Sequence, residues 1–324
     1  MLAVADRLVA LRPDVLVLTD IDHDLGGAAL GALADLLAQR GLSYPHRFHP
    51  TPNTGIATGL DLDRNGRLGE ARDAQGYGRF PGDGGLAVLS RLPLGVARDL
   101  SNVLWRDLPG NRMTEAERAD DRAPVQRLGT AGHWILTVEG PSGAFDLWLF
   151  AATPPVFDGP EDRNGRRNAD EIALWLRLLD GSLPERRDAP FVIAGLANLD
   201  PLDGEGLHET IAALLSHPEL QDPRPASPGG PAAARDAHRG DPAFDTADFG
   251  DPEPGNLRVS YVLPSRDWQV TGAGVDWPVS PDDTGLRHKM VWADLTLPRI
   301  STRRRAFAAL EAAMSPRRPA HRPP

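Results

Sequence analysis

Apolar residues recur along this chain in two periods, one typical of buried strands and one typical of amphipathic helices. Residues 13–20 read PDVLVLTD, a short continuous apolar run that predicts a strand buried on both faces. Apolar spacing predicts helices on either side of this strand, over about 2–11 and 27–40, with Gly41 in the position of a helix C-cap. Helix, strand and helix in this order indicate an alternating α/β arrangement.

The same two signals continue through most of the chain. Short apolar runs predict further strands at residues 86–89, 133–138, 146–151, 191–194, 257–263 and 290–295. Apolar spacing predicts two more helices, over about 168–179 and 206–215. Because no clear linker separates these elements, the pattern favours one α/β domain with two sheets, which we place at residues 1–297.

Two segments lack this periodicity. Residues 222–255 are dense in Pro, Gly, Ala and Asp, which predicts a long surface loop. Residues 298–324 form a basic Pro/Arg-rich tail with one short amphipathic helix. The tail is interpreted either as a frayed end or as a contact for an anionic partner.

Composition and charge exclude several classes of function. The 324 residues include no Cys, so disulfide frameworks, thiolate zinc sites and cysteine nucleophiles are excluded, and any metal must be held by oxygen or imidazole. The net charge of −10 argues against binding nucleic acid through bulk charge. Neither a membrane span nor a signal peptide is visible. The sequence predicts a soluble protein, cytoplasmic as written and exported if a signal peptide lies upstream of Met1.

One short motif carries a metal signal. It is a D-x-D-x-N-G run whose oxygen ligands, spaced as in the first half of a calcium loop, are Asp61, Asp63 and Asn65. Arg72 occupies the position of the usual bidentate Glu, so Glu70 or Asp73 would have to substitute for it. The run is interpreted either as a structural calcium site or as an ordinary Asx-rich turn.

A second group of polar residues is distributed over distant strands. Asp20 ends one predicted strand, Asn198 and Asp200 follow another, and His288 immediately precedes a third. Acids, amides and imidazoles at the ends of neighbouring strands are how α/β enzymes assemble oxygen-rich metal and phosphate sites. Their joint placement predicts one site.

These residues fall within motifs that resemble the endonuclease/exonuclease/phosphatase family. The motifs occur in family order and read PDVLVLTDID, GLAVLSRLPL, FAATPPVFDGPEDRNGRRNADEI, GLANLDP, GNLRVSYVLPS and RHKMVWADL. PNTGIATGLDLD and DAQGYG further resemble a bacterial branch of the family. The resemblance covers about residues 15–297. It implies a four-layer α/β/β/α sandwich of two mixed sheets, and an attack of water on a phosphoester with Mg²⁺ or Mn²⁺ as cofactor.

The resemblance assigns roles residue by residue. Asp20 matches the metal-binding acid, Asn198 matches the amide of an Asp-x-Asn motif, and His288 matches the terminal imidazole. Three arginines of the PPVFDGPEDRNGRRN motif are candidates for bidentate contacts with substrate phosphate, namely Arg163, Arg166 and Arg167. The expected partner is a phosphoester-containing small molecule or a nucleic acid.

Several family positions are substituted. The Asp of Asp-x-Asn falls on Leu196, a strand His falls on Ala151, and an Asp before Tyr falls on Ser260. Arg287 stands where many relatives have an Asp beside the terminal His. The resemblance places the family's first strand, with its metal-binding Asn, before the helix predicted at about 2–11. Either the true start of the protein lies upstream of Met1, or this strand of the sheet is missing.

We therefore expect impaired catalysis, because an alkyl group at Leu196 cannot position or deprotonate water. Nearby acids offer a second possibility if they reach the pocket on loops, namely Asp158, Glu161, Asp162 and Asp200. Two hypotheses follow from these residues. The chain is either a phosphoester hydrolase with a weak or rearranged metal centre, or a non-catalytic relative that binds a phosphate ligand or a protein.

Overall fold

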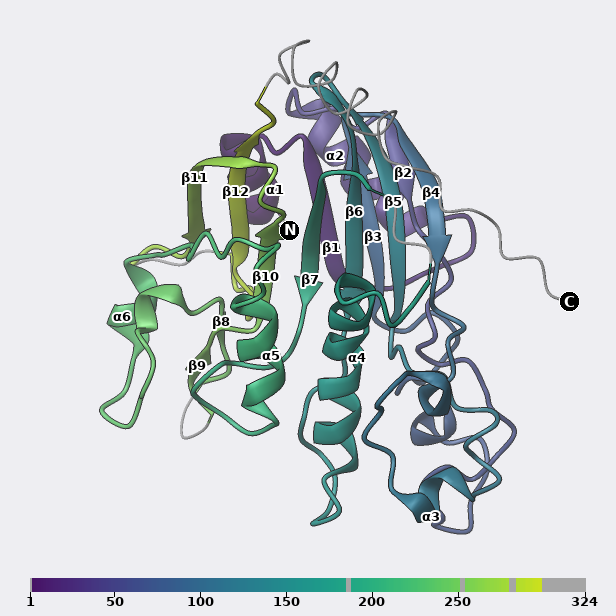
Figure 1. Ribbon diagram of the computed structural model, residues 1–324. Coiled ribbons are helices and arrows are strands. Elements are labelled where there is room, and N and C mark those ends of the chain that lie inside the picture. The colour runs from purple at the N-terminus through teal and green to yellow at the C-terminus, as the bar shows by residue number, and fades with distance from the viewer. Residues whose placement is uncertain (1, 185–187, 251–253, 280–283, 299–324) are drawn as a thin grey trace, which may run out of the picture.

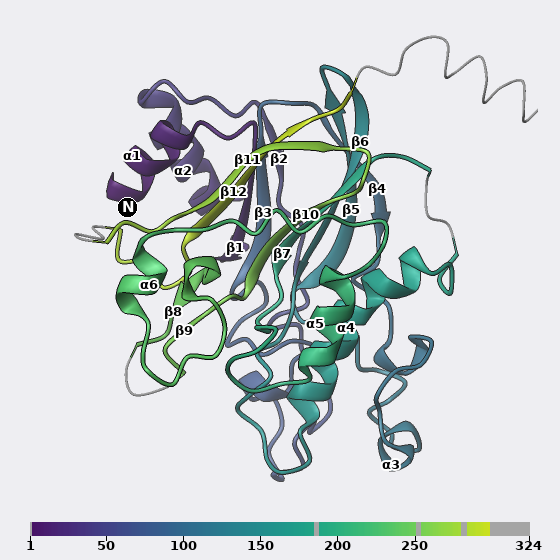
Figure 2. The same cartoon turned by 60° about the vertical axis from the view of Figure 1, so that its left-hand side comes forward.

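Two β-sheets pack face to face in the middle of the molecule, and helices cover the outer face of each sheet (Figures 1 and 2). The structure is a computed structural model that describes residues 2–184, 188–250, 254–279 and 284–298. The four layers confirm the predicted α/β/β/α fold class. Of the two layers of sheet, the five-stranded one is mixed, as predicted, and all strand pairs of the other are antiparallel. The tail predicted at 298–324 lies, except for its first residue, outside the described residues.

The helices agree with the predicted ones within a few residues at most ends. The α-helices are α1 (Leu2–Leu11), α2 (Ala28–Gln39), α3 (Glu115–Arg118), α4 (Arg163–Leu179), α5 (His208–Leu215) and α6 (Gly229–Ala233). Three single turns of 3₁₀-helix are η1 (Ala71–Asp73), η2 (Trp105–Asp107) and η3 (Pro242–Phe244). Helix α4 begins five residues before the predicted position, because its first turn is polar and carries no apolar period.

The strands include all of those predicted and several that lack a continuous apolar run. They are β1 (Val15–Ile21), β2 (His46–Phe48), β3 (Gly85–Ser90), β4 (Leu94–Asp99), β5 (Gly132–Gly140), β6 (Gly143–Ala151), β7 (Phe191–Leu196), β8 (Ala247–Asp248), β9 (Asn256–Leu257), β10 (Ser260–Pro264), β11 (Gln269–Asp276) and β12 (Met290–Thr296). The single strand predicted at 257–263 is divided, since its start pairs with β8 and its end pairs with β7.

One sheet has five strands in the order β10-β7-β6-β5-β4. Strands β6 and β7 are parallel, and α4 connects them across one face of the sheet, as a parallel pair requires. A core of large side chains fills the space beneath α4 and α5. Its fully buried aromatic members are Trp105, Trp148, Phe150, Trp175 and Phe191.

The other sheet layer consists of two separate pieces. One piece has the order β1-β3-β2, and the other is the pair β11-β12. Both pack against the five-stranded sheet, because Val15 and Val17 of β1 and Leu295 of β12 join the core between the sheets. In the described ranges no strand pairs with the second edge of β1 or of β12.

This division explains a difference from the sequence prediction. The apolar run at β1 predicts burial on both faces, yet Val15, Leu16, Val17 and Leu18 are each half-buried. The inner face of β1 packs against the five-stranded sheet, and its outer face packs against α1 and α2. The exposure arises because β1 lies at a sheet edge, where neither neighbour nor side chain covers the strand laterally.

The segment predicted as a long surface loop, 222–255, is more ordered than its composition suggests. It carries α6, η3 and β8, and it buries Asp245, Thr246 and Ala247. Its hydrogen bonds connect it to β9 and to the segment before β12, so it forms a wall of the molecule. None of the helices in the described ranges has the length and apolar character that a membrane crossing requires.

Candidate functional site

A cleft of about 950 Å³ opens at the edge of the sheets where β1, β6 and β7 end. Because β6 and β7 are parallel, the loops that follow them reach the same edge. Strands β10 and β12 begin there, and the wall formed by the 222–255 segment closes one side. In Figure 1 this edge is the lower end of the central strands.

The fold brings the three predicted polar residues to this cleft. Asp20, Asn198 and His288 all line it, although they are far apart in the sequence. Asp20 is the unpaired residue at an irregularity of the β1 ladder, between Thr19 and Ile21, and has a φ of 59°. Asn198 has a φ of 53°, and its Nδ2 donates a hydrogen bond of 2.8 Å to the carbonyl of Ala152. Asn and Asp tolerate this left-handed conformation better than most residues.

The carboxyl group of Asp20 lies among other acids. Partial burial raises its pKa above the usual value, and the nearby charges of Asp22 and Asp83 raise it further. The guanidinium of Arg287 acts in the opposite direction. The carboxyl group of Asp20 therefore keeps its proton to a higher pH than that of an ordinary surface aspartate.

The backbone of His288 is paired, and its imidazole packs against an aromatic ring. Its residue bridges to Ala247, and its ring lies perpendicular to the Phe249 ring at 5.5 Å between centroids. Burial, together with the charges of Arg287 and Lys289, lowers its pKa. The buried Nδ1 atom has no hydrogen-bond partner within the described part of the chain. Within the described ranges no carboxylate is hydrogen-bonded to this ring.

The substituted positions lie side by side across three strands. Ala151 on β6 is in register with Leu196 on β7, and Leu196 is in register with Ser260 on β10. Ala151 and Leu196 line the cleft as part of an apolar floor, which we define by Ala131, Ala151, Leu196, Ala247, Leu257 and Val259. The alkyl groups of Ala151 and Leu196 thus lie in the cleft at positions where the resemblance expects polar groups.

Two acids near Asn198 have their oxygens occupied by the backbone. Asp200 accepts hydrogen bonds from the N–H groups of Leu202, Asp203 and Arg258. Asp203 accepts from the N–H groups of Arg239 and Gly240. These carboxylates organise the loops around the cleft, and their geometry offers no replacement for the carboxylate missing at Leu196.

The residues of the cleft do not fit a firmly held divalent metal. Mg²⁺ and Mn²⁺ favour several oxygen ligands, among them carboxylates. Asp20 is the one acid of the predicted set, and the cation of Arg287 lies near enough to affect it. Leu196 supplies no ligand. We therefore derive no chemical step through a metal at this place.

Sequence reasoning missed a buried group of titratable residues on the wall of the cleft. The Nε2 atom of His238 lies 3.2 Å from Oδ2 of Asp245 and 3.6 Å from Oδ2 of Asp203. Burial raises the pKa of Asp245 to about 8, and the charges of Asp200 and Asp203 contribute. Asn256 donates to the same carboxylate. No periodic or motif signal marks these residues, because the backbone of the irregular 222–255 segment brings them together.

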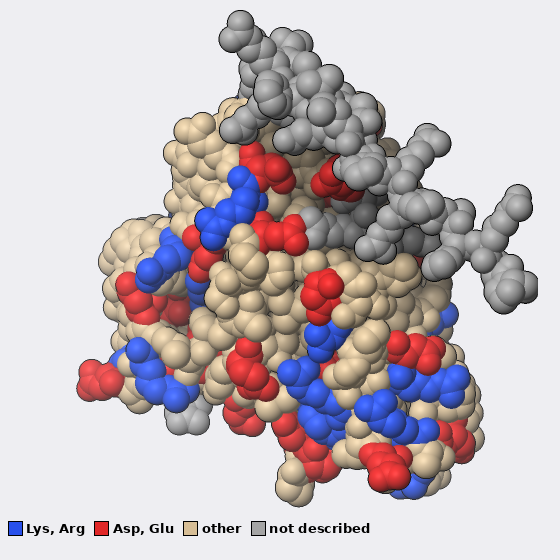
Figure 3. Space-filling view, in the orientation of Figure 1, with Lys and Arg blue, Asp and Glu red and all other residues tan. Residues whose placement is uncertain are grey.

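The three predicted phosphate-binding arginines lie outside the cleft. Arg166 makes a two-pronged ion pair with Glu117, and Arg163 lies 5.3 Å over the Trp105 ring. Arg167 is buried and donates to the carbonyls of Gln75, Arg127 and Leu128. Figure 3 shows basic side chains gathered over α3 and α4 with acids interleaved among them. The geometry supports structural roles for these arginines and does not support a role in binding substrate.

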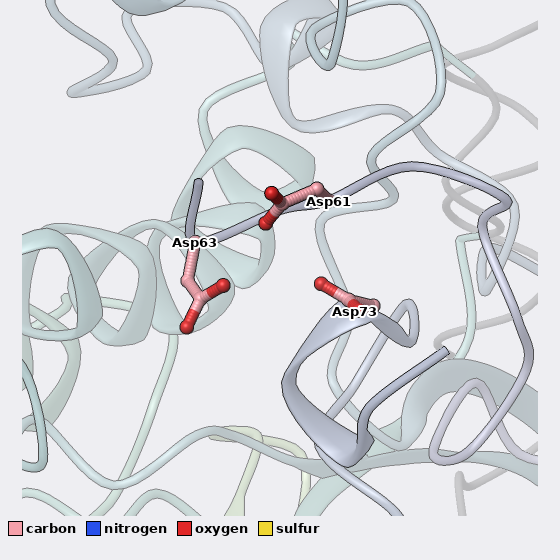
Figure 4. Close-up of side chains that lie close together, drawn as sticks. All are labelled: Asp61, Asp63 and Asp73. Atoms are coloured by element: carbon pink, nitrogen blue, oxygen red, sulfur yellow. The ribbon is translucent and has the colours of Figure 1, made fainter. Parts of the chain in front are cut away.

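The aspartate-rich turn lies away from the cleft, and the structure adds a third acid to it. Oxygen atoms of Asp61, Asp63 and Asp73 lie within 4.8 Å of one another, a group that could hold a metal ion (Figure 4). Asp73 is one of the two substitutes considered from the sequence. The same carboxylates accept backbone hydrogen bonds, for example from Asn65 and Gly66 to Asp61, as an Asx-rich turn requires. The local geometry is thus compatible with either interpretation.

The four-layer α/β/β/α sandwich with a cleft at its strand ends defines the general class, an α/β protein whose loops form a site at one edge of the sheets. The model of the endonuclease/exonuclease/phosphatase family matches residues 1–301, and the chain belongs to this family. A search of curated proteins found no match.

Solved structures agree with this fold. An endonuclease/exonuclease/phosphatase from Beutenbergia cavernae is similar at 20% identity and a TM-score of 0.55, with 91% of this chain and 65% of that chain covered. A family protein from Bacteroides thetaiotaomicron is similar at 11% identity and a TM-score of 0.50, with 91% and 88% covered. This chain thus spans less than two thirds of the length of the Beutenbergia protein.

Proposed function

We propose that this protein binds a phosphoester-containing ligand in the cleft and hydrolyses it poorly or not at all. Family membership supports the class of ligand, since the family comprises nucleases and phosphatases. The observation that carries the proposal is the row formed by Ala151, Leu196 and Ser260 across β6, β7 and β10. Ala151 and Leu196 of this row place alkyl groups in the cleft where the resemblance expects an imidazole and a carboxylate that act on water.

The magnitude of the expected defect follows from the chemistry. A positioned general acid or base contributes about 10²–10⁴-fold to a rate. Losses within one catalytic unit are not additive, so the substitutions need not multiply. We expect the unmodified protein to be slower, by at least about 100-fold, than a variant in which the missing polar groups are restored.

The test compares the unmodified chain with the triple variant Ala151→His, Leu196→Asp, Ser260→Asp. Turnover of a bis-aryl phosphate is measured with Mg²⁺ or Mn²⁺. A second variant, in which Leu196→Asn replaces Leu196→Asp, is a control of similar size that lacks the carboxylate. The proposal predicts turnover in the Asp variant above both the control and the unmodified chain.

Two results would contradict the proposal. One is a rate for the unmodified chain that equals the rate of the Asp variant. If the Asp variant does not fold, the unmodified chain is tested alone. Metal-dependent turnover that is abolished by His288→Ala would then contradict the proposal. Circular dichroism and thermal melting establish folding for every variant before its rate is compared.

A further inference from the structure

One cation of the cleft, Arg287, has the charge of Asp20 nearby but forms no ion pair with it or with any other described acid. Arg287 lines the cleft and is exposed, and no ion pair or side-chain hydrogen bond engages it within the described residues. Its guanidinium carbon lies 5.6 Å from the centroid of the Phe249 ring. Contact with an aromatic face orients a guanidinium and leaves its N–H groups available.

The other basic residues near the cleft are already engaged. Lys289 donates to the carbonyl of Leu286 and lies 4.9 Å over the Trp277 ring. Arg235 donates to the carbonyl of Gly250, and Arg239 lies 3.5 Å from Asp203. Among the described basic residues that line the cleft, Arg287 is therefore the one without a side-chain hydrogen bond or ion pair.

The backbone fixes the position of Arg287. Its carbonyl accepts a hydrogen bond of 3.0 Å from the N–H of Asp248, and the next two residues bond to Ala247 and Thr246. The segment is thus attached to β8 along its length. A charge on such a segment is pre-organised, so little ordering is required when an anion binds.

The neighbouring residue supplies a second polar group. His288 follows Arg287 directly, and its buried Nδ1 atom lacks a partner within the described residues. Buried polar atoms without a partner are uncommon in folded proteins. A guanidinium and an imidazole at one end of an apolar floor are complementary to a ligand with an anionic head and an apolar body.

We propose that Arg287 and His288 bind the phosphoryl group of an organic phosphate without a metal ion, while its apolar part lies on the floor over Ala151 and Leu196. This inference rests on the proposed function and specifies the ligand. Arg287 supplies the positive charge that a divalent metal would otherwise supply. The positive charge of Arg287 thus disfavours a metal ion in the cleft and favours an anion there.

The test uses phenyl phosphate and inorganic phosphate as probes, with isothermal titration calorimetry on the full chain. We expect phenyl phosphate to bind with the same Kd, within about twofold, in EDTA and in Mg²⁺. Inorganic phosphate should bind at least about tenfold more weakly, because it lacks the ring that covers the apolar floor. Arg287→Ala should weaken phenyl phosphate binding by at least about tenfold.

Matched variants separate the role of Arg287 from general charge effects. Arg47→Ala removes an exposed arginine of β2 outside the cleft and should leave the Kd unchanged. The Kd of Arg287→Lys for phenyl phosphate should lie between the Kd of the unmodified chain and that of Arg287→Ala, since Lys cannot make a bidentate contact. Thermal melting confirms that each variant is folded.

Several results would overturn the inference. They are binding that requires Mg²⁺, a Kd for Arg287→Ala equal to that of Arg47→Ala, and no detectable binding of phenyl phosphate. Failure of the proposed function is a different result, namely rapid hydrolysis by the unmodified chain. A protein that hydrolyses slowly and binds the probe only with Mg²⁺ would leave the proposed function standing and refute this inference.

Discussion

His133 shows how the surroundings of one side chain determine its chemistry. Its side chain is fully buried between Phe150, at 5.8 Å, and Trp175, at 5.2 Å between ring centroids. The Nε2–H group donates to the carbonyl of Glu171 at 2.9 Å, which leaves Nδ1 without a proton or a partner among the described residues. Burial lowers its pKa from 6.5 to about 4. The imidazole is neutral in the folded protein and belongs to the core.

This shift predicts a loss of stability in acid. Between pH 6.5 and about 4 the unfolded chain binds a proton at His133 that the folded chain does not bind. The free energy of unfolding should therefore fall as the pH is lowered through this window, by up to about 3 kcal/mol from this residue. Urea unfolding of the unmodified chain and of His133→Gln between pH 4 and pH 7.5 measures the effect.

The variant isolates the contribution of this group from that of the carboxylates. Gln retains a donor for the carbonyl of Glu171 but does not titrate. The difference in free energy of unfolding between the unmodified chain and the variant should therefore shrink as the pH falls. A difference that stays constant across the whole range would show that His133 is not the source.

At the scale of elements, the division of one sheet layer into β1-β3-β2 and β11-β12 has a dynamic consequence. Strand β6 is bonded on both sides, to β5 and to β7, whereas β1 is bonded to β3 alone. Amides that face the second edge of β1 lack a strand partner in the described ranges. Regions with exposed backbone hydrogen-bonding groups open at lower free energy than central strands.

We predict that amide exchange shows this asymmetry. Alternate amides of Val15–Ile21 that do not pair with β3 should exchange at least about 100-fold faster than those of Gly143–Ala151, which corresponds to a difference of about 3 kcal/mol in opening free energy. Hydrogen–deuterium exchange followed by NMR provides the measurement. Equal protection on both edges of β1 would contradict the prediction.

The aspartate-rich turn is a second element whose properties can be tested. We predict that Ca²⁺ binds at Asp61, Asp63 and Asp73 and stabilises the folded chain by roughly 1 to 3 kcal/mol at 10 to 100 times its Kd. The Asp61→Asn variant keeps an oxygen that accepts backbone hydrogen bonds and loses the charge, so it should lose most of this gain. Thermal melting with and without Ca²⁺ measures the shift.

Asp236→Asn, at an exposed position in the 222–255 segment, is the control and should respond to Ca²⁺ as the unmodified chain does. If Ca²⁺ moves none of the melting curves, the turn is held by its own hydrogen bonds and the interpretation as an Asx-rich turn is correct.

At the scale of the whole molecule, four layers position one cleft. The floor combines the ends of β6 and β7 with β8, β9 and residues next to strands. Asp20 comes from β1, and the 222–255 segment supplies the wall. Substitution of a few side chains on this floor leaves the three packed cores intact, because the cores use different residues. The fold is therefore expected to persist when the chemistry of the cleft changes, as fold and function are separable.

Local periodicity determined most of the elements. Hydrophobic spacing is a property of neighbouring residues, so it predicted the four long helices and the main strands without knowledge of their partners. It also singled out the strand ends that carry Asp20, Asn198 and His288. It failed at β4 and β11, which lack a continuous apolar run, and at the 222–255 segment.

The tertiary structure alone decided which side chains meet. Arginines 163, 166 and 167 occur in one motif, yet Glu117, Trp105 and backbone carbonyls of distant loops engage them away from the cleft. No sequence motif marks His238 and Asp245, and the irregular backbone of the 222–255 segment brings them together. Spacing along a chain reflects local conformation, whereas a site depends on contacts between distant residues, and these form only when the layers pack.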